Sequence, residues 1–186
     1  MFPNSVFWGE MSPCAHSVQI YGNDAVFLEM LSQFVASGVR HGEAVIVIAT
    51  PEHVAQLGIR LEGHGIDVRA AKAEDRLLLC DAEETLARFM VDGMPDEARF
   101  EASVRALMRR AHGPRGRKVR AFGEMVAILW ERRAYAATVR LEQLWTRLCE
   151  AERFELFCAY PREVFPKNAA ESISEICRLH SRVVTA

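Results

Sequence analysis

Polar side chains stand at the ends of several short apolar stretches, and they are the residues of this sequence best suited to chemistry. Tyr21, Thr50 and Asp81 each come directly after such a stretch, Glu124 follows one after Gly123, and Tyr160 follows the last one. Together, phenols, a hydroxyl and carboxylates could bind a small organic ligand. In an enzyme, a carboxylate could also hold a metal ion or activate water. Their use depends on whether the fold brings them to one place.

Three of these residues also have a structural explanation. Thr50 precedes Pro51, and Asp81 stands three residues before Glu84, so both hydroxyl and carboxylate can cap the start of a helix. We favour the capping interpretation for both. For Glu124 two interpretations stay open: a carboxylate that acts on a ligand or metal, and an acid that stabilises the positive end of a helix.

The turn after the first apolar stretch lacks the chemistry of a phosphate-binding loop. That loop reads Gly-x-x-x-x-Gly-Lys followed by Ser or Thr, and its backbone amides, lysine and hydroxyl hold phosphates and Mg²⁺. Here the turn is Gly22, Asn23 and Asp24, with no lysine and an acid where phosphate would lie. We therefore expect no ATP hydrolysis at this turn. Asn23 can instead cap the following helix or contact a different ligand.

The sequence shows no hydrolase nucleophile and no complete metal site. It has no Gly-x-Ser-x-Gly elbow, and no cysteine has a histidine at a recognisable spacing. Cys14 and His16 could both bind a metal, but two ligands without partners make a weak site. We predict no catalytic residue, no metal and no cofactor. For His16 we favour a role in orienting the N-terminal arm or packing under the sheet over contact with a ligand.

The apolar stretches alternate with helical spacing, which predicts the fold. The expected strands are 17–20, 44–49, 77–80, 119–122 and 154–160. This alternation predicts a three-layer α/β domain with a mostly parallel central sheet and helices on both faces. The carboxyl ends of parallel strands meet at one edge, where such sheets bind ligands. We therefore expect the five polar strand ends to share that edge, with Phe122, Tyr160 and Phe165 lining an apolar pocket there. Trp145 is expected in the core.

Two local features are also expected from the spacing of apolar residues and glycines. Gly38 follows the apolar face of the first helix and is expected to end that helix in the left-handed conformation. Residues 66–70 are expected to form a short strand at the edge of the sheet. These details affect the boundaries of the domain but not its class.

Composition limits the class of protein. The chain has 186 residues, 50% of them hydrophobic, and a net charge of −2, which suits one globular domain. We expect residues 1–15 to form an N-terminal arm and 16–186 a single domain. The charge argues against nucleic-acid and membrane-surface binding, and the basic run at 105–120 is better explained as a solvated helix end and loop. Short apolar runs, no signal peptide and five cysteines without a CxxC pair predict a cytoplasmic protein.

Several segments together resemble one known family. They read HSVQIY, VRAFGEMVAILW, LEQLWTRLC, FCAYP and EICRLHSRVV. They resemble the MEDS domain, the methanogen/methylotroph, DcmR-type sensory domain, over about residues 14–184. The resemblance implies a divergent RecA/KaiC-like fold without a working phosphate-binding loop, which agrees with the predicted sheet. It also implies sensing of small molecules such as hydrocarbon derivatives, beside histidine-kinase or DNA-binding modules.

The resemblance also selects positions along the chain. Those to carry over are His16, Tyr21, Glu124, Trp145, Tyr160 and His180. The family often shows His-x-Cys-x-x-Tyr at the first strand, and Val18 stands here in place of that cysteine. Thiol-based sensing at this position is therefore not expected.

These observations predict a bacterial, non-hydrolytic sensory domain. It would bind a small, largely apolar or nucleotide-like molecule at the strand-end edge and shift between two conformations that a partner reads. The expected ligand contacts are Tyr21, Asn23, Thr50, Glu124 and Tyr160, supported by His16, Asp81, Phe122, Trp145 and His180. The sequence carries no output domain, so a stand-alone sensor would act on a separate histidine kinase or transcription regulator. It could also form a homo-oligomer.

Two alternatives stay open. The first is a ligand-free interaction scaffold that docks a kinase or regulator. The second is an enzyme that uses Glu124 with an unrecognised cofactor.

Overall fold

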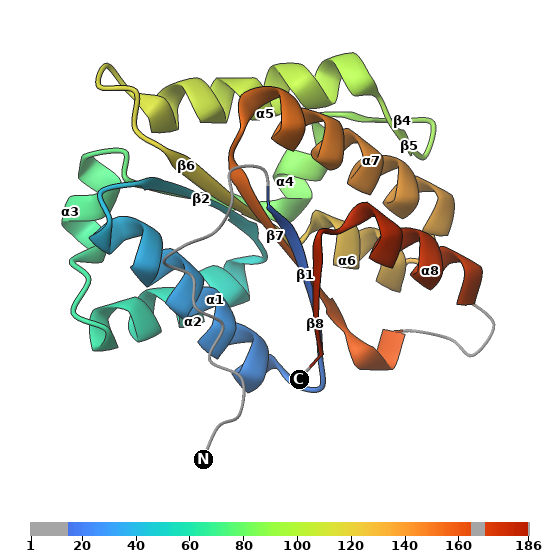
Figure 1. Ribbon diagram of the computed structural model, residues 1–186, viewed down its shortest axis with the longest axis horizontal. Coiled ribbons are helices and arrows are strands. Elements are labelled where there is room, and N and C mark those ends of the chain that lie inside the picture. The colour runs from blue at the N-terminus through green and yellow to red at the C-terminus, as the bar shows by residue number, and fades with distance from the viewer. Residues whose placement is uncertain (1–14, 165–169, 186) are drawn as a thin grey trace.

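A parallel six-stranded sheet forms the middle layer of the computed structural model, which describes residues 15–164 and 170–185 (Figure 1). Residues 1–14, most of the expected N-terminal arm, lie outside the described residues. The strand order is β3 (Leu77–Asp81), β2 (Ala44–Ala49), β6 (Val119–Gly123), β7 (Glu155–Pro161), β1 (His16–Tyr21) and β8 (Arg182–Thr185), and every neighbouring pair is parallel. The prediction of a three-layer α/β fold is confirmed.

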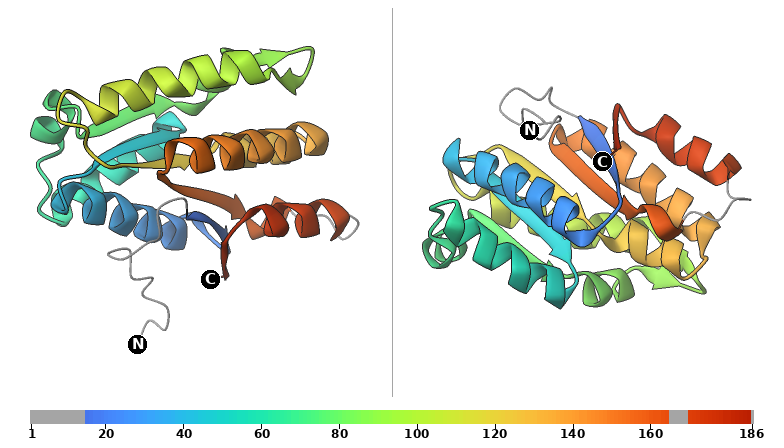
Figure 2. Two further views of the ribbon diagram at one scale, coloured as in Figure 1. Left: turned by 45° about the horizontal axis from the view of Figure 1, so that its top comes forward. Right: turned by 90° about the horizontal axis from the view of Figure 1, so that it is seen from below.

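Helices cover both faces of this sheet (Figure 2). One face carries α1 (Asp24–Arg40), α2 (Pro51–Gly63) and α3 (Val68–Ala73). The other face carries α4 (Ala82–Ala87), α5 (Glu97–His112), α6 (Met125–Glu131), α7 (Tyr135–Glu152) and α8 (Ala170–Leu179). A small antiparallel hairpin, β4 (Met90–Val91) and β5 (Met94–Pro95), and a 3-10 turn at Arg162–Val164 complete the described elements. None of the described helices is long and apolar enough to cross a lipid bilayer.

The continuous apolar sequence of β2 explains why it lies inside the sheet. Val45 and Val47 pack under α1 and α2, whereas Ile46 and Ile48 pack under α4 to α7. Because successive side chains of a strand point to opposite faces, a strand covered on both sides needs apolar residues throughout. β2 therefore separates two hydrophobic cores, one on each face.

The register of the strands places the polar strand ends at one edge, as expected. Ala49 pairs with Asp81, Ile48 with Gly123, Gly123 with Cys158, and Tyr21 with Pro161. The residues that come directly after these positions, including Thr50 and Glu124, therefore lie at the same edge of the sheet, where the carboxyl ends of the strands meet. Sharing an edge does not mean sharing a face, however, and this difference divides the expected site in two.

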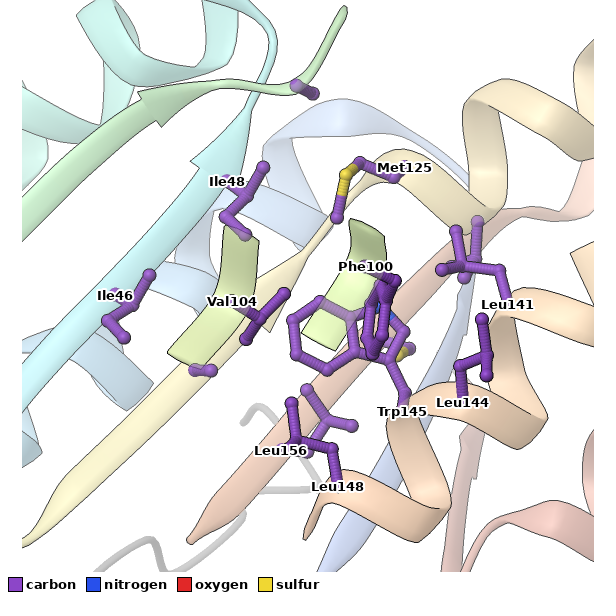
Figure 3. Close-up of a cluster of buried hydrophobic side chains, with 14 of the residues drawn as sticks. Ile46, Ile48, Phe100, Val104, Met125, Leu141, Leu144, Trp145, Leu148 and Leu156 are labelled. Carbon is purple, nitrogen blue, oxygen red and sulfur yellow. The ribbon is translucent and has the colours of Figure 1, made fainter. Parts of the chain in front are cut away.

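Trp145 lies at the centre of the larger core, as predicted (Figure 3). Its ring meets that of Phe100 edge to face, with centroids 5.0 Å apart, and Val104, Leu144 and Leu148 surround the pair. A ring pair of this geometry contributes about 0.5–1.5 kcal/mol beyond the area it buries. Trp145 thus fixes α7 against α5 and the sheet and belongs to the core rather than to a binding surface.

The structure corrects three local predictions. Residues 66–70 form no strand, because Asp67 caps α3 by accepting a hydrogen bond from the Ala70 amide at 2.8 Å. Gly38 does not end α1 but lies inside it, where a methyl group would stand 2.8 Å from Arg120 Cδ. Arg120 closes the basic run, yet it is 2% exposed and pairs with Glu43, so that residue is not part of a solvated loop.

Candidate functional site

The carboxylate of Glu124 connects two segments at the carboxyl edge of the sheet. Its Oε2 accepts a hydrogen bond from the Thr50 backbone amide at 2.8 Å, and its Oε1 lies 2.7 Å from His53 Nδ1. Glu124 follows β6, whereas Thr50 and His53 belong to the start of α2. We call this three-residue arrangement the Glu124 latch. It holds the first turn of α2 against the end of β6.

These contacts show which helix the Glu124 carboxylate stabilises, whereas a role in ligand binding stays a prediction. The Glu124 side chain makes no capping bond to its own helix, α6. It lies instead at the amino end of α2, where the partial positive charge of the helix favours an anion. His53 was not predicted, because a contact 71 residues distant in sequence leaves no local signal. The hydrogen bond to Glu124 is the main cause that raises the pKa of His53, and burial opposes it.

Tyr21 lies under α1, beside the latch, in an aromatic group. Its ring stacks on Phe27 with centroids 4.8 Å apart, and Phe27 in turn contacts both Phe122 and His53. Burial is the largest cause that raises the pKa of the Tyr21 phenol, followed by the negative charges of Glu124 and then of Asp24 and Glu131. This part of the edge therefore combines an apolar wall with a negative electrostatic potential.

Two of the expected ligand contacts, Asn23 and Thr50, and one expected supporting residue, Asp81, act as helix caps. Asn23 Oδ1 accepts from the Val26 amide at 3.1 Å at the start of α1. Thr50 Oγ1 accepts from the His53 amide at 3.4 Å, and Asp81 Oδ1 accepts from the Glu84 amide at 2.9 Å. The capping interpretation of Thr50 and Asp81 is confirmed. Asn23 therefore already occupies a backbone amide at the start of α1 that a bound anion at this turn would use.

Tyr160 does not join these residues, although it stands at the same edge. Its side chain points to the face covered by α6 and α7 and packs against Trp130, whereas Phe122 and Tyr21 point to the face under α1. The expected pocket shared by Phe122 and Tyr160 is therefore wrong, and Phe165, the third residue expected there, lies outside the described residues. Strand alternation explains the error, because a common edge still leaves two opposite faces.

On that second face, Tyr160 belongs to a buried polar group around Glu142. The members are His16 of β1, Glu142 of α7, Cys158 and Tyr160 of β7, and His180, which follows α8. We call this group the Glu142 cluster. The Tyr160 hydroxyl donates a hydrogen bond to Glu142 Oε1 at 2.5 Å. Each of the five residues of the cluster is less than a tenth exposed. Side chains from β1, from β7 and from the residue after α8 thus converge on one carboxylate of α7.

The second oxygen of Glu142 faces both histidines and the thiol. His16 Nε2 lies 3.4 Å from Oε2, His180 Nε2 lies 3.6 Å from it, and Cys158 Sγ lies 3.6 Å from it. The two imidazole rings are adjacent, with centroids 3.9 Å apart. One ligand atom from each of His16, Glu142, Cys158 and His180 falls within 4.8 Å of the others. A metal ion is thus one occupant that these residues could hold.

Burial and charge set the protonation states of this cluster. Burial alone would raise the pKa of Glu142, but His180, His16 and Tyr160 together lower it to about 2. Burial lowers the pKa of His180, which favours the neutral imidazole. Burial and the Glu142 charge raise the pKa of Cys158 well above its ordinary value. The cluster therefore surrounds one buried, ionised carboxylate, that of Glu142, with groups whose contacts hold its pKa low.

One feature of the sequence points to this cluster. Glu142 lies on the buried face of α7, with Thr138, Trp145 and Cys149 at spacings of four, three and seven residues. A carboxylate within an apolar stripe requires a partner, because an unpaired buried charge is very costly. The partners themselves could not be found, since His16 and His180 stand more than 35 residues away in sequence.

Comparison with protein families identifies the domain. The model of the MEDS family, "MEthanogen/methylotroph, DcmR Sensory domain", matches residues 15–181. The chain belongs to the MEDS family. No match was found among the curated proteins with which the chain was compared.

The structure sorts the positions that the MEDS resemblance selected into two places. His16, Tyr160 and His180 meet in the Glu142 cluster, whereas Tyr21 and Glu124 lie at the edge under α1. Val18, which replaces a cysteine often seen in MEDS sequences, pairs in register with Cys158. The thiol beside His16 in this MEDS domain therefore comes from β7 and not from β1.

Proposed function

We propose that this MEDS domain senses a small organic molecule at the carboxyl edge beside Tyr21, and does so without hydrolysing a nucleotide. The observation that carries the proposal is the Glu124 latch, in which one carboxylate holds α2 through Thr50 and His53. A ligand that donates a hydrogen bond to Glu124 would replace one of these bonds and release the start of α2. Such a ligand shifts the population of two arrangements of the helix, which a signalling partner can read.

The surroundings of the latch define the chemistry of the ligand. The rings of Tyr21 and Phe27 supply an apolar wall, and the nearby carboxylates of Asp24, Glu124 and Glu131 repel anions. An uncharged or cationic organic molecule suits this environment, whereas a triphosphate meets like charge. This electrostatic argument supports the non-hydrolytic part of the proposal. A histidine kinase or transcription regulator is the partner that we propose for such a sensory domain.

Thermal-shift measurements with a panel of small molecules test this proposal. Uncharged and cationic compounds are expected to raise the Tm of the parent protein, whereas Mg-ATP and carboxylic acids are not. Binding that uses the latch should be lost in Glu124→Gln, which keeps the shape of the side chain but removes its charge. The matched control is Glu155→Gln, which makes the same change at the first residue of β7, where the strands of the sheet begin rather than end.

The outcomes separate the proposal from its alternatives. Compounds that stabilise Glu124→Gln as strongly as the parent would place the ligand elsewhere. Nucleotide turnover that disappears in Glu124→Gln would support the enzyme alternative. For the scaffold alternative, the large apolar side chains exposed in the described part of the chain are Ile59, Met94 and Val183, on three separate elements. These three residues suggest no single docking surface.

A further inference from the structure

We propose that His16, Glu142, Cys158 and His180 form a binding site for one divalent transition-metal ion of the zinc class. Each residue offers one ligand atom, and the four atoms lie within 4.8 Å of one another. The site lies on the face of the sheet covered by α7, whereas the Glu124 latch lies at its edge beside α2. This inference is therefore independent of the ligand proposed for that edge.

Four of the six distances between the ligand atoms match four-coordinate zinc, and the other two are at most 4.8 Å. Bonds of about 2.0–2.3 Å at tetrahedral angles place neighbouring ligand atoms about 3.4–3.6 Å apart. His16 Nε2 lies 3.4 Å from Glu142 Oε2 and 3.4 Å from Cys158 Sγ. Glu142 Oε2 lies 3.6 Å from both His180 Nε2 and Cys158 Sγ. His16, Glu142 and Cys158 therefore need little rearrangement to surround one ion, and His180 Nε2 lies close enough to complete the site.

Hydrogen bonds made by the Nδ1 atoms of His16 and His180 orient both imidazole rings for metal binding through Nε2. His180 Nδ1 lies 2.7 Å from the Ile176 carbonyl oxygen, which can only accept, so Nδ1 carries the hydrogen. Thr146 donates its hydroxyl hydrogen to the Glu142 carbonyl at 2.9 Å and therefore accepts from His16 Nδ1 at 3.1 Å. Both Nε2 atoms are then left with a lone pair directed at the centre of the cluster, the arrangement that protein metal sites use.

The lone pair of His180 has no hydrogen-bonding partner. His180 Nε2 is completely buried and makes no hydrogen bond, although Glu142 Oε2 lies 3.6 Å away. Two lone pairs that face a carboxylate oxygen repel it unless a positive charge lies between them. A proton on one imidazole would satisfy one of these contacts. A metal cation satisfies all four ligand atoms at once.

Charge balance also favours a divalent ion. When the metal binds, the Cys158 thiol loses its proton to solvent and the sulfur bonds to the metal. One thiolate, one carboxylate and two neutral imidazoles then surround a 2+ ion, so the buried site has no net charge. Nitrogen and sulfur ligands select zinc, cobalt or nickel over magnesium and calcium. Four protein ligands with no open position are typical of a structural rather than a catalytic zinc site.

Metal analysis and cobalt spectroscopy test this proposal on the untagged full chain. Protein purified without chelators is expected to contain about one equivalent of zinc. After the metal is removed with a chelator, Co²⁺ should produce the intense visible bands of four-coordinate cobalt and a near-ultraviolet thiolate-to-cobalt band. Zinc added afterwards should abolish both. A parent protein that gives no thiolate band with Co²⁺ would overturn the proposal.

Two buried cysteines allow a matched comparison. Cys158→Ser is expected to abolish the thiolate-to-cobalt band and weaken binding at least about tenfold. Cys149→Ser removes an equally buried thiol that donates to the Phe154 carbonyl, outside the cluster, and should leave the band intact. If Cys158→Ser keeps the band and the affinity of the parent, the metal lies elsewhere and the proposal is wrong.

A conservative variant protects the test against misfolding. Tyr160→Phe keeps the volume of the ring and removes only the hydrogen bond to Glu142 Oε1. It is expected to fold, to keep the thiolate band and to bind Co²⁺ about 10–100-fold more weakly, as for other partners of metal ligands. If Tyr160→Phe binds Co²⁺ as tightly as the parent, Glu142 is not a ligand and the four-residue site is wrong.

Discussion

Gly38 shows how strongly the packing of this domain depends on a single position. A methyl group there would lie 2.8 Å from both Arg120 Cδ and Val45 Cγ2, too close for either neighbour. We expect Gly38→Ala to destabilise the protein by about 1–3 kcal/mol, because overpacking forces side chains and backbone to shift. Chemical denaturation monitored by circular dichroism measures this change.

Gly58 provides the matched control for that substitution. It also lies within a helix, α2, but nothing is within 4 Å of an added methyl group. Gly58→Ala should therefore stabilise the protein by about 0.5–1 kcal/mol, the usual gain from replacing a helical glycine. Equal effects of the two substitutions would contradict the view that close contact with Arg120 explains Gly38.

Residue types alone predicted the local contacts of the edge but not the distant ones. Asn23, Thr50 and Asp81 cap helices as their positions indicate, because a capping bond spans only three residues. The partner of Glu124 could not be predicted, since His53 is 71 residues away. The prediction for Gly38 was wrong because it also depended on a residue distant in sequence. The close approach of Arg120 requires a glycine at this position, and the backbone of Gly38 is not in the left-handed conformation.

Between elements, the Glu124 latch predicts a pH dependence of stability. The hydrogen bond to Glu124 raises the pKa of His53 above its ordinary value of 6.5. The folded state therefore binds the proton more tightly than the unfolded chain. Its stabilising effect is complete below pH 6.5 and is lost as the pH rises through the higher folded pKa. We expect this effect to be about 1 kcal/mol.

Thermal unfolding of the parent and of His53→Gln between pH 5 and pH 9 measures this effect. The difference in Tm should be largest at pH 5 and should decrease through neutral pH. His41→Gln removes an exposed histidine at the far end of α1 and serves as the control. A difference between parent and His53→Gln that stays constant with pH would show that His53 contributes only packing against Phe27.

The periodicity of the elements predicted the sheet but not which face each functional side chain would occupy. Apolar runs located β1, β2, β3, β6 and β7, because buried parallel strands need such runs. The strand β8 was missed, since its short sequence follows α8 after only two residues. The Glu142 cluster was missed because its members come from segments whose crossing is decided by tertiary packing.

At the scale of the whole molecule, the two outermost strands of the sheet, β3 and β8, are held in place by different contacts. Among the described strands, β3 pairs only with β2, but α3, α4 and α5 all contact it. Within the same described set, β8 pairs only with β1, and α8 contacts α7. Two contacts between His16 and the turn before β8 strengthen that edge: the Ser181 hydroxyl accepts from the His16 amide and donates to the His16 carbonyl, both at 3.0 Å. His180 adds its contact with Glu142.

This difference predicts that residues 170–185 open locally more readily than the opposite edge. Ser181→Ala removes both hydroxyl bonds and leaves the backbone bond from the Ser181 amide to the His16 carbonyl. Two such bonds contribute roughly 1.4 kcal/mol together, which corresponds to about tenfold faster amide exchange in this segment. Peptides that cover β2 and β3 should exchange as in the parent, because local opening of β8 does not expose them.

Hydrogen–deuterium exchange with mass spectrometry measures both regions in one experiment. Ser174→Ala changes an exposed serine of α8 and is the control for removing a hydroxyl from the same segment. Faster exchange throughout the chain would mean that Ser181 supports global stability and that the C-terminal edge does not open separately. Unchanged exchange at 170–185 would mean that the Ser181 bonds to His16 do not hold this edge. A local increase would establish that the segment carrying His180 can separate from β1 while the rest of the sheet stays folded.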